Sequence, residues 1–312
     1  MKTLIVGAGA LGILFAGIMS SHGGDVEILT RRTEAAEAIS SEGVVVEEES
    51  STIRAWPECS TDPSTALDAD VCIICVKSYD TGPVAEMILP YLPESCLVVT
   101  VQNGLNNVKK LAEILGPERI IGGCTMQAST LTGLNRVFHA YNGETVLGGH
   151  PATTTQKNQI KRVAEELTRL GLKTSVTDNV YPQIVTKLIV NSVINPLTAL
   201  LRLRNGEILK IPVLGELVNE LVDEGVEAGR VLGVRLSSVE LKKVVHEAII
   251  STSENKSSML QDIERGRKTE IEFINGAIAR ILRDEGKAAP LNTILTQLVL
   301  AIEQGRQALE RK

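Results

Sequence analysis

The chain of 312 residues is longer than a single hydrophobic core usually organises, so its length predicts two domains. Its 43% hydrophobic content is mostly aliphatic, with only 3% aromatic residues, which favours helices and parallel strands over β-sandwiches. The net charge of −6 excludes the basic surface that would hold a nucleic-acid backbone.

The first half of the chain predicts strands alternating with helices. Residues 3–6 form a β-branched run, which a glycine-rich turn joins to an apolar helix ending near Met19. Further strands are expected at 25–29, 44–46 with 51–54, 71–76 and 97–101, and helices at 33–40, 105–115 and 156–170. Shorter antiparallel or edge strands are expected from 120, at 136–139 and at 145–147. This alternation predicts an α/β fold with a Rossmann-type doubly wound sheet.

After Asp178 the strand signals disappear. Long helical patterns follow at 180–201, 213–232, 237–250, 269–283 and 291–309. We therefore expect an N-terminal domain at 1–178 and an all-helical C-terminal domain at 179–312, with the ligand bound between them.

Two features invite other interpretations. Cys72-Ile-Ile-Cys75 resembles a metal or redox motif, but positions three apart on a strand face opposite sides, so we expect buried thiols. The apolar run at 4–19 resembles a signal peptide, but its glycine spacing has a better explanation, and it is shorter than the roughly 20 residues that span a bilayer. The odd number of five cysteines fits a reducing compartment. We expect a cytoplasmic protein without a membrane segment or a metal.

The glycine-rich turn has the sequence Gly7-Ala8-Gly9-Ala10-Leu11-Gly12. It directly follows the first strand and opens a helix, which is the context of a dinucleotide site. Gly7 permits the turn, Gly9 lets the backbone approach a pyrophosphate, and Gly12 allows close packing of helix on strand. The phosphates would lie at the helix N-terminus, where unpaired N–H groups attract anions.

The end of the second strand carries Thr30-Arg31-Arg32. A carboxylate there would contact the ribose 2′-hydroxyl of NAD, whereas guanidinium groups pair with the 2′-phosphate of NADP. The arginines therefore favour NADPH. Glu34 keeps NAD open as an alternative, and an arginine can also simply end an exposed strand.

A polar stripe crosses the apolar helix that follows Asp178. Gln183, Lys187, Asn191 and Asn195 are spaced four apart, and Lys187 is the only charged residue between Asp178 and Arg202. A solvent-facing stripe would more typically carry Glu, Lys and Arg. Reduction of a carbonyl group needs a proton donor and hydrogen-bond donors at its oxygen, which a lysine with neighbouring amides supplies.

Three segments together closely resemble the ketopantoate reductase (2-dehydropantoate 2-reductase) family, over nearly the whole chain. They are the glycine motif at 7–12, the stretch Lys187 to Pro196 with its two asparagines, and Ser257-Ser258-Met-Leu-Gln-Asp262 with Thr269-Glu270-Ile271. The glycine motif is shared by all Rossmann families, and the other two segments are more specific.

The resemblance implies roles for individual residues. Lys187 matches the family's general acid, and Glu270 matches the acidic residue that orients it and contacts substrate. Arg31 matches the 2′-phosphate contact, and Lys77 matches a position beside the nicotinamide. The matched substrate-binding positions are Asn103, which also lies beside the nicotinamide, Asn191, Asn195 and Ser258.

Each of these residues also has a structural interpretation. Asn103-Gly104 is an ordinary turn dipeptide, Lys77 can end a strand, and Ser258 begins a capping-box pattern. Glu270 lies in a charged run where most carboxylates are solvated. The four histidines fit no triad or ligand spacing.

The resemblance implies NADPH-dependent reduction of 2-dehydropantoate to pantoate, a step toward pantothenate and coenzyme A, by a possible homodimer. Two alternatives remain open from the residues alone. One is a related reductase of another 2-oxo or 3-hydroxy acid, and the other is a non-catalytic NADP-sensing protein.

Overall fold

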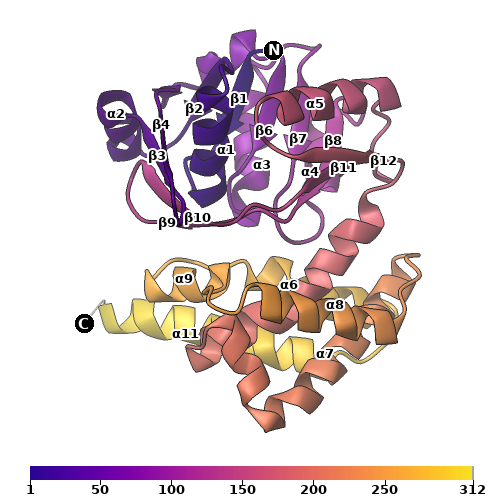
Figure 1. Ribbon diagram of the computed structural model, residues 1–312. Helices are drawn as coiled ribbons and strands as arrows, with labels where there is room; N and C mark the ends of the chain where they lie inside the picture. Colours follow the sequence, from indigo (N-terminus) through magenta and orange to yellow (C-terminus); the bar gives the residue numbers. More distant parts are fainter. Residues whose placement is uncertain (311–312) are drawn as a thin grey trace. The chain divides into compact units, whose positions relative to one another are not determined.

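A computed structural model describes residues 1–310 (Figure 1). The chain divides into two compact units. The first, which we call the N-terminal unit, comprises residues 1–102 and 106–181. The second, the helical unit, comprises residues 103–105 and the chain from Pro182 onward. The expected fold class, a Rossmann-type sheet followed by a helical region, is confirmed.

The N-terminal unit contains an eight-stranded sheet (Figure 1). Its strands are parallel except that the last two along one edge, β11 and β12, run antiparallel to the rest. The four-residue runs of β1, β2, β6 and β7 are buried throughout, as strands covered on both faces should be. The order across the sheet is β12 (Thr174–Thr177), β11 (Thr145–Gly148), β8 (Ile120–Thr125), β7 (Leu97–Thr100), β6 (Val71–Ile74), β1 (Thr3–Val6), β2 (Val26–Leu29) and β5 (Glu58–Ser60).

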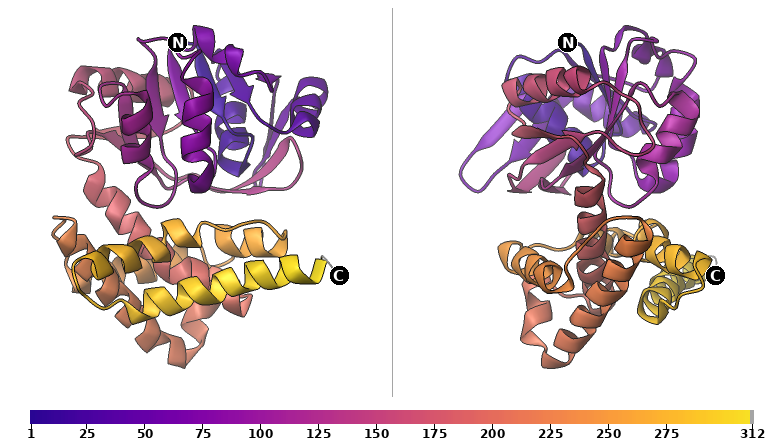
Figure 2. Two further views of the ribbon diagram at one scale, coloured as in Figure 1. Left: turned by 180° about the vertical axis from the view of Figure 1, so that it is seen from behind. Right: turned by 90° about the vertical axis from the view of Figure 1, so that its right-hand side faces the viewer.

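Helices cover both faces of this sheet (Figure 2). Helices α1 (Ala10–Ser21) and α5 (Lys157–Arg169) share one hydrophobic core with alternate strand residues such as Ile5 and Ile73. Helices α3 (Thr81–Ile88) and α4 (Asn107–Leu115) pack on each other at the other face. Helix α2 (Thr33–Glu42) packs near the β5 edge.

A second, four-stranded sheet lies against α1. Helix α1 thus has the main sheet on one side and this small sheet on the other, which accounts for its burial from Gly12 to Met19. The strands expected at 44–46 and 51–54 are confirmed as β3 and β4, which pair antiparallel. The order is β4 (Thr52–Ala55), β3 (Val44–Glu47), β10 (Arg136–Tyr141) and β9 (Ala128–Leu131).

Some strand expectations were wrong. The strand at 120–125, expected to be antiparallel or at an edge, is not an edge strand: it is buried inside the sheet, with β7 parallel on one side and β11 antiparallel on the other. Strands β5, β9 and β12 were not expected, because they are short and carry few apolar side chains. Their strand conformation comes from pairing with a neighbour rather than from their own residue preferences.

The helical unit contains six α-helices among the described residues. Its core includes the fully buried Leu221, Val245, Ile278 and Val299. The helices are α6 (Tyr181–Leu201, with its first residue in the N-terminal unit), α7 (Pro212–Val231), α8 (Ser238–Ser251), α9 (Ser258–Glu264), α10 (Asn275–Asp284) and α11 (Pro290–Glu310).

The single helix expected at 269–283 was wrong. Thr269 and Glu270 lie outside any helix, a short 3-10 turn covers Ile271–Phe273, and α10 begins only at Asn275. The interruption leaves Glu270 in a non-helical conformation.

By length and composition, α6 could cross a membrane. However, 72% of its apolar window is buried inside the structure, which is typical of a core helix.

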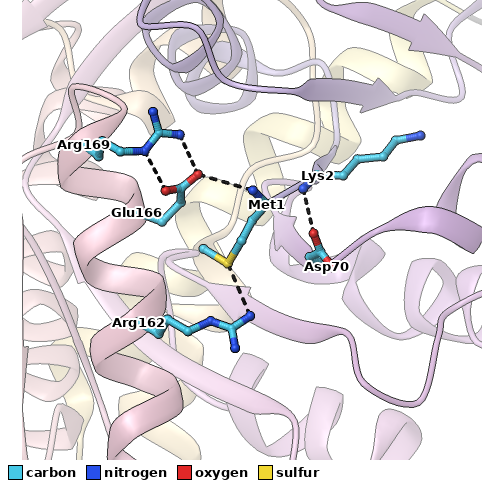
Figure 3. Close-up of polar contacts among 6 residues, drawn as sticks. All are labelled: Met1, Lys2, Asp70, Arg162, Glu166 and Arg169. Atoms are coloured by element: carbon cyan, nitrogen blue, oxygen red, sulfur yellow. Dashed lines mark hydrogen bonds and ion pairs between the residues drawn. The ribbon is translucent and has the colours of Figure 1, made fainter.

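The first two residues of the chain contact α5 and the loop before β6 (Figure 3). The Glu166 carboxylate accepts two hydrogen bonds of 2.8 Å from Arg169 and lies 3.5 Å from the amino group of Met1. The backbone N–H of Lys2 donates to Asp70 Oδ2 at 2.9 Å. These contacts join the N-terminal residue to α5.

We expect Glu166→Gln to lower the free energy of unfolding at pH 7 by about 1 kcal/mol. The hydrogen bonds from Arg169, with the nearby terminal amine, hold the pKa of Glu166 below its ordinary value of 4.5. The carboxylate therefore stabilises the fold fully above that value, and its contribution is lost as the pH falls through the lower folded-state pKa.

Urea unfolding near neutral pH and at about pH 3 measures this effect. The control is Glu165→Gln, because Glu165 is exposed and pairs only loosely with Lys161 at 3.6 Å. A deficit for Glu166→Gln that is equally large at both pH values would contradict the expectation.

Candidate active site

The glycine loop forms a tight turn between β1 and α1. Gly7 adopts a φ of 114°, which side chains disfavour, and its N–H donates to the Leu29 carbonyl at 2.8 Å. A Cβ atom on Gly12 would lie 1.9 Å from the Gly7 carbonyl oxygen. Both residues are therefore fixed as glycine by the turn itself.

Gly9 has a different environment. It is the N-cap of α1, and a Cβ atom there would meet nothing closer than the Cys75 carbonyl oxygen at 3.8 Å. Ala10 and Leu11 begin the helix, whose first turn has neither a capping side chain nor an acidic residue. The turn therefore leaves backbone N–H groups and the positive end of the helix dipole for an anion such as a pyrophosphate.

The two arginines after β2 have different partners. Arg31 is exposed and forms a two-point ion pair with Asp80, with N–O distances of 3.1 and 3.2 Å. Arg32 is half-buried, and its Nη2 donates to the Ala8 carbonyl in the glycine loop at 2.5 Å. Arg32 therefore holds the loop, whereas Arg31 pairs with Asp80 and not with the loop in any of these contacts.

Lys77 and Asn103 follow the carboxyl ends of β6 and β7, where open parallel sheets bind ligands. Sequence reasoning missed Gln102, whose Nε2 donates to the Val76 carbonyl at 2.7 Å and to Thr81 Oγ1 at 2.9 Å. Gln102 thus connects two segments. One is the loop that contains Lys77, and the other is the end of β7, which leads into Asn103. No sequence pattern marked it, because Val76 lies 26 residues away.

Asn103 belongs to the helical unit together with Gly104 and Leu105. The Leu105 N–H donates to the Phe273 carbonyl at 3.3 Å. This contact joins the loop of Asn103 to the segment that follows Glu270.

The polar stripe of α6 is not a solvent face. Gln183, Lys187 and Asn191 are half-buried, and Asn195 is buried at 5% exposure. Glu270 is likewise buried, at 6% exposure, although it follows an exposed charged run. The preceding Thr269 is fixed by hydrogen bonds of 2.9 and 2.6 Å to Glu303.

Ser258 is exposed and is the first residue of α9. The suggestion that it caps this helix was wrong. The cap is Ser257, whose hydroxyl accepts from the Leu260 N–H at 3.1 Å and also receives a 2.7 Å hydrogen bond from Thr198 on α6. Ser258 therefore keeps its hydroxyl outside the cap.

The cysteines of the CxxC segment are thiols in an apolar setting. Cys72 is fully buried, and Cys75 is half-buried just beyond the end of β6. Burial raises the pKa of the Cys75 thiol to about 12. A thiol that resists ionisation in this way is a poor nucleophile and a poor metal ligand.

A glycine loop on a parallel sheet, with a lysine and a buried carboxylate in a separate helical unit, defines the class of NAD(P)-dependent oxidoreductases. Residues 3–152 match the family described as "Ketopantoate reductase PanE/ApbA", and residues 179–303 match its C-terminal region. The chain belongs to the ketopantoate reductase family.

Individual relatives agree with this assignment. The chain is 33% identical to a 2-dehydropantoate 2-reductase of Archaeoglobus fulgidus, covering 97% of this chain and 98% of that protein. A ketopantoate reductase structure from Ralstonia eutropha superimposes with a TM-score of 0.90 at 29% identity, covering 98% and 100% of the two chains. A D-mandelate dehydrogenase solved with NADH and anilino(oxo)acetate gives a TM-score of 0.91 at 26% identity, covering 98% and 99%.

Proposed function

We propose that the protein reduces 2-dehydropantoate to pantoate with NADPH, a step toward pantothenate and coenzyme A. The observation that carries this proposal is Lys187, the only charged residue of the 21-residue helix α6. It is half-buried in the same unit as the buried carboxylate Glu270.

The proposed chemistry assigns a role to each group of residues. Bound NADPH supplies a hydride, which adds to the C2 carbonyl carbon of the substrate. Negative charge then develops on the carbonyl oxygen, and Lys187 Nζ donates the proton that neutralises it. Glu270 orients this ammonium group and contacts the substrate. The uncharged donors that hold the substrate are Asn103, Asn191, Asn195 and Ser258.

The residues of the N-terminal unit fit the cofactor. The loop at 7–12 and the uncapped start of α1 suit a pyrophosphate, because they offer N–H groups without a competing side chain. In this unit we assign Lys77 to the nicotinamide end and Arg31 to the 2′-phosphate; Asn103, which belongs to the helical unit, is also assigned to the nicotinamide end.

We expect Arg31→Ala to raise the KM for NADPH by about 10- to 100-fold and to leave the KM for NADH within about twofold, because only NADPH carries the 2′-phosphate. Initial rates followed by absorbance with each cofactor measure this. Arg169→Ala is the control, since Arg169 is an exposed arginine paired with Glu166. An equal rise in KM for NADPH and for NADH would contradict the assignment of Arg31 to the 2′-phosphate.

A second candidate follows from the match to D-mandelate dehydrogenase, which was solved with NADH. It is the reduction of an aromatic 2-oxo acid. Initial rates with 2-dehydropantoate and with the 2-oxo acid that corresponds to mandelate, each with NADPH and NADH, distinguish the two candidates. The proposal expects the highest kcat/KM for 2-dehydropantoate with NADPH. Tight NADPH binding without turnover of any 2-oxo acid would instead favour a sensing protein.

The proposal extends to the organisation of the protein. Residues 1–178 bind NADPH, and residues 179–312 bind substrate and form a homodimer in the cytoplasm. Exposed apolar side chains on α11, Ile294 and Leu298, support an interface on the helical unit. The odd number of five cysteines supports a reducing compartment.

A further inference from the structure

Helix α6 contains a proline in its interior, Pro196. Proline has no backbone N–H, so the carbonyl of Ser192, four residues earlier, lacks its regular helical donor. Ser192 is completely buried. It lies between Asn191 and Asn195, which the proposed function assigns to the substrate. A buried carbonyl needs another donor at this point.

Asn275 supplies that donor. Its Nδ2 lies 2.8 Å from the Ser192 carbonyl oxygen and 2.9 Å from Asn292 Oδ1, so its two amide hydrogens have two acceptors. The side chain is completely buried, and its Oδ1 has no hydrogen-bond partner among residues 1–310. Among these contacts, Asn275 therefore contributes only its two amide hydrogens.

Asn292, the acceptor of the second amide hydrogen of Asn275, is itself held by Glu224. Asn292 Nδ2 and the Asn292 N–H both donate to Glu224 Oε2, at 2.7 and 3.0 Å. The Leu291 N–H donates to Glu224 Oε1 at 2.9 Å. Because Glu224 takes the donors of Asn292, the Asn292 amide must turn its oxygen to Asn275. The chain of hydrogen bonds thus runs from Glu224 on α7 through α11 and α10 to the Ser192 carbonyl in α6.

Asn275 also stands close to Glu270 in the sequence. It begins α10, and the residue before it, Ile274, donates its N–H to the Glu270 carbonyl at 3.1 Å. One side chain therefore links the backbone segment of Glu270 to the turn of α6 that carries Asn191 and Asn195.

We infer that Asn275 is a positioning residue for the reductase reaction. By holding the Ser192 carbonyl, it sets the position of the Asn191 and Asn195 amides relative to Glu270. This inference rests on the proposed function, because it takes these residues to be the substrate site.

Asn275→Ala tests the inference. The variant should lower kcat/KM for 2-dehydropantoate by about 10- to 100-fold, since small displacements of positioning groups have effects of this size. The Kd for NADPH, measured by fluorescence, should stay within about twofold, because the glycine loop lies in the other unit. If the alanine variant does not fold, Asn275→Leu removes the same donors while keeping the branched shape and the number of heavy atoms of the side chain.

The matched control is Asn292→Ala, which shortens the same chain of hydrogen bonds but leaves the Asn275 bond to Ser192. It should lower the melting temperature similarly and keep kcat/KM within about threefold of the wild-type value.

Pro196→Ala provides a rescue, because an alanine at 196 restores the N–H that bonds to the Ser192 carbonyl. Added to Asn275→Ala, it should recover about tenfold in kcat/KM.

Two results would overturn the inference. The first is an equal loss of kcat/KM in Asn275→Ala and Asn292→Ala, and the second is no recovery with Pro196→Ala. Each result is a ratio to the wild type, measured with whichever 2-oxo acid the wild type reduces. A wild-type enzyme that reduces another 2-oxo acid but not 2-dehydropantoate therefore contradicts only the proposed substrate. A wild type that reduces no 2-oxo acid counts against both.

Discussion

Lys187→Ala should lower kcat with 2-dehydropantoate by about 10²- to 10⁴-fold, because general-acid catalysis contributes rate factors of this size. The carbonyl oxygen then has no positioned proton donor as the hydride arrives. The Kd for NADPH should stay within about twofold, because Lys187 lies in the helical unit and the glycine loop in the N-terminal unit. Absorbance assays at saturating substrate and fluorescence titration of NADPH measure the two quantities.

Lys256→Ala is the control for this experiment. Lys256 is a half-exposed lysine of the same unit and pairs with Glu264 at 2.6 Å, so its loss should leave kcat unchanged. A Lys187→Ala enzyme whose kcat stays within about threefold of the wild-type value would remove Lys187 as the acid.

Gly9→Ala should abolish detectable dinucleotide binding while leaving the melting temperature within about 2 °C of the wild-type value. The turn itself has room for the added methyl group, whose nearest neighbour would lie at 3.8 Å. The requirement for glycine must then come from the close approach of the pyrophosphate to the backbone. Calorimetric titration with NADPH and thermal unfolding measure the two effects.

Gly12→Ala is the matched comparison within the same loop. Its Cβ atom would lie 1.9 Å from the Gly7 carbonyl oxygen, so this variant should lose stability as well as binding. If Gly9→Ala binds NADPH normally, the pyrophosphate does not approach the loop as proposed.

Much of the fold could be predicted from the sequence because its signals are local. The continuous apolar run at 71–76 and the glycine turn after residues 3–6 each depend on neighbouring residues, and both elements form as expected. Strand β12 could not be predicted, because Thr174–Thr177 is polar and takes its conformation from parallel pairing with β11. The break before α10 could not be predicted either, because the helical spacing of apolar residues continues through residues 269–274.

The candidate site shows the same division. The isolation of Lys187 and its spacing from Asn191 are visible in the sequence, and the structure places both residues in a half-buried setting. Glu270 could be singled out only by family resemblance, because the charged run before it is typical of a solvated surface. Its burial depends on packing in the helical unit rather than on its neighbours in the sequence.

The sequence by itself determined the glycine loop, the arginines after β2 and the polar stripe of α6, because each is a pattern within a few residues of one element. Only the tertiary structure decided their partners. Arg31 meets Asp80 across 49 residues, and Asn275 reaches Ser192 across 83. Such contacts arise when the fold buries a polar group and a distant side chain must satisfy it, and local sequence patterns carry no record of that requirement.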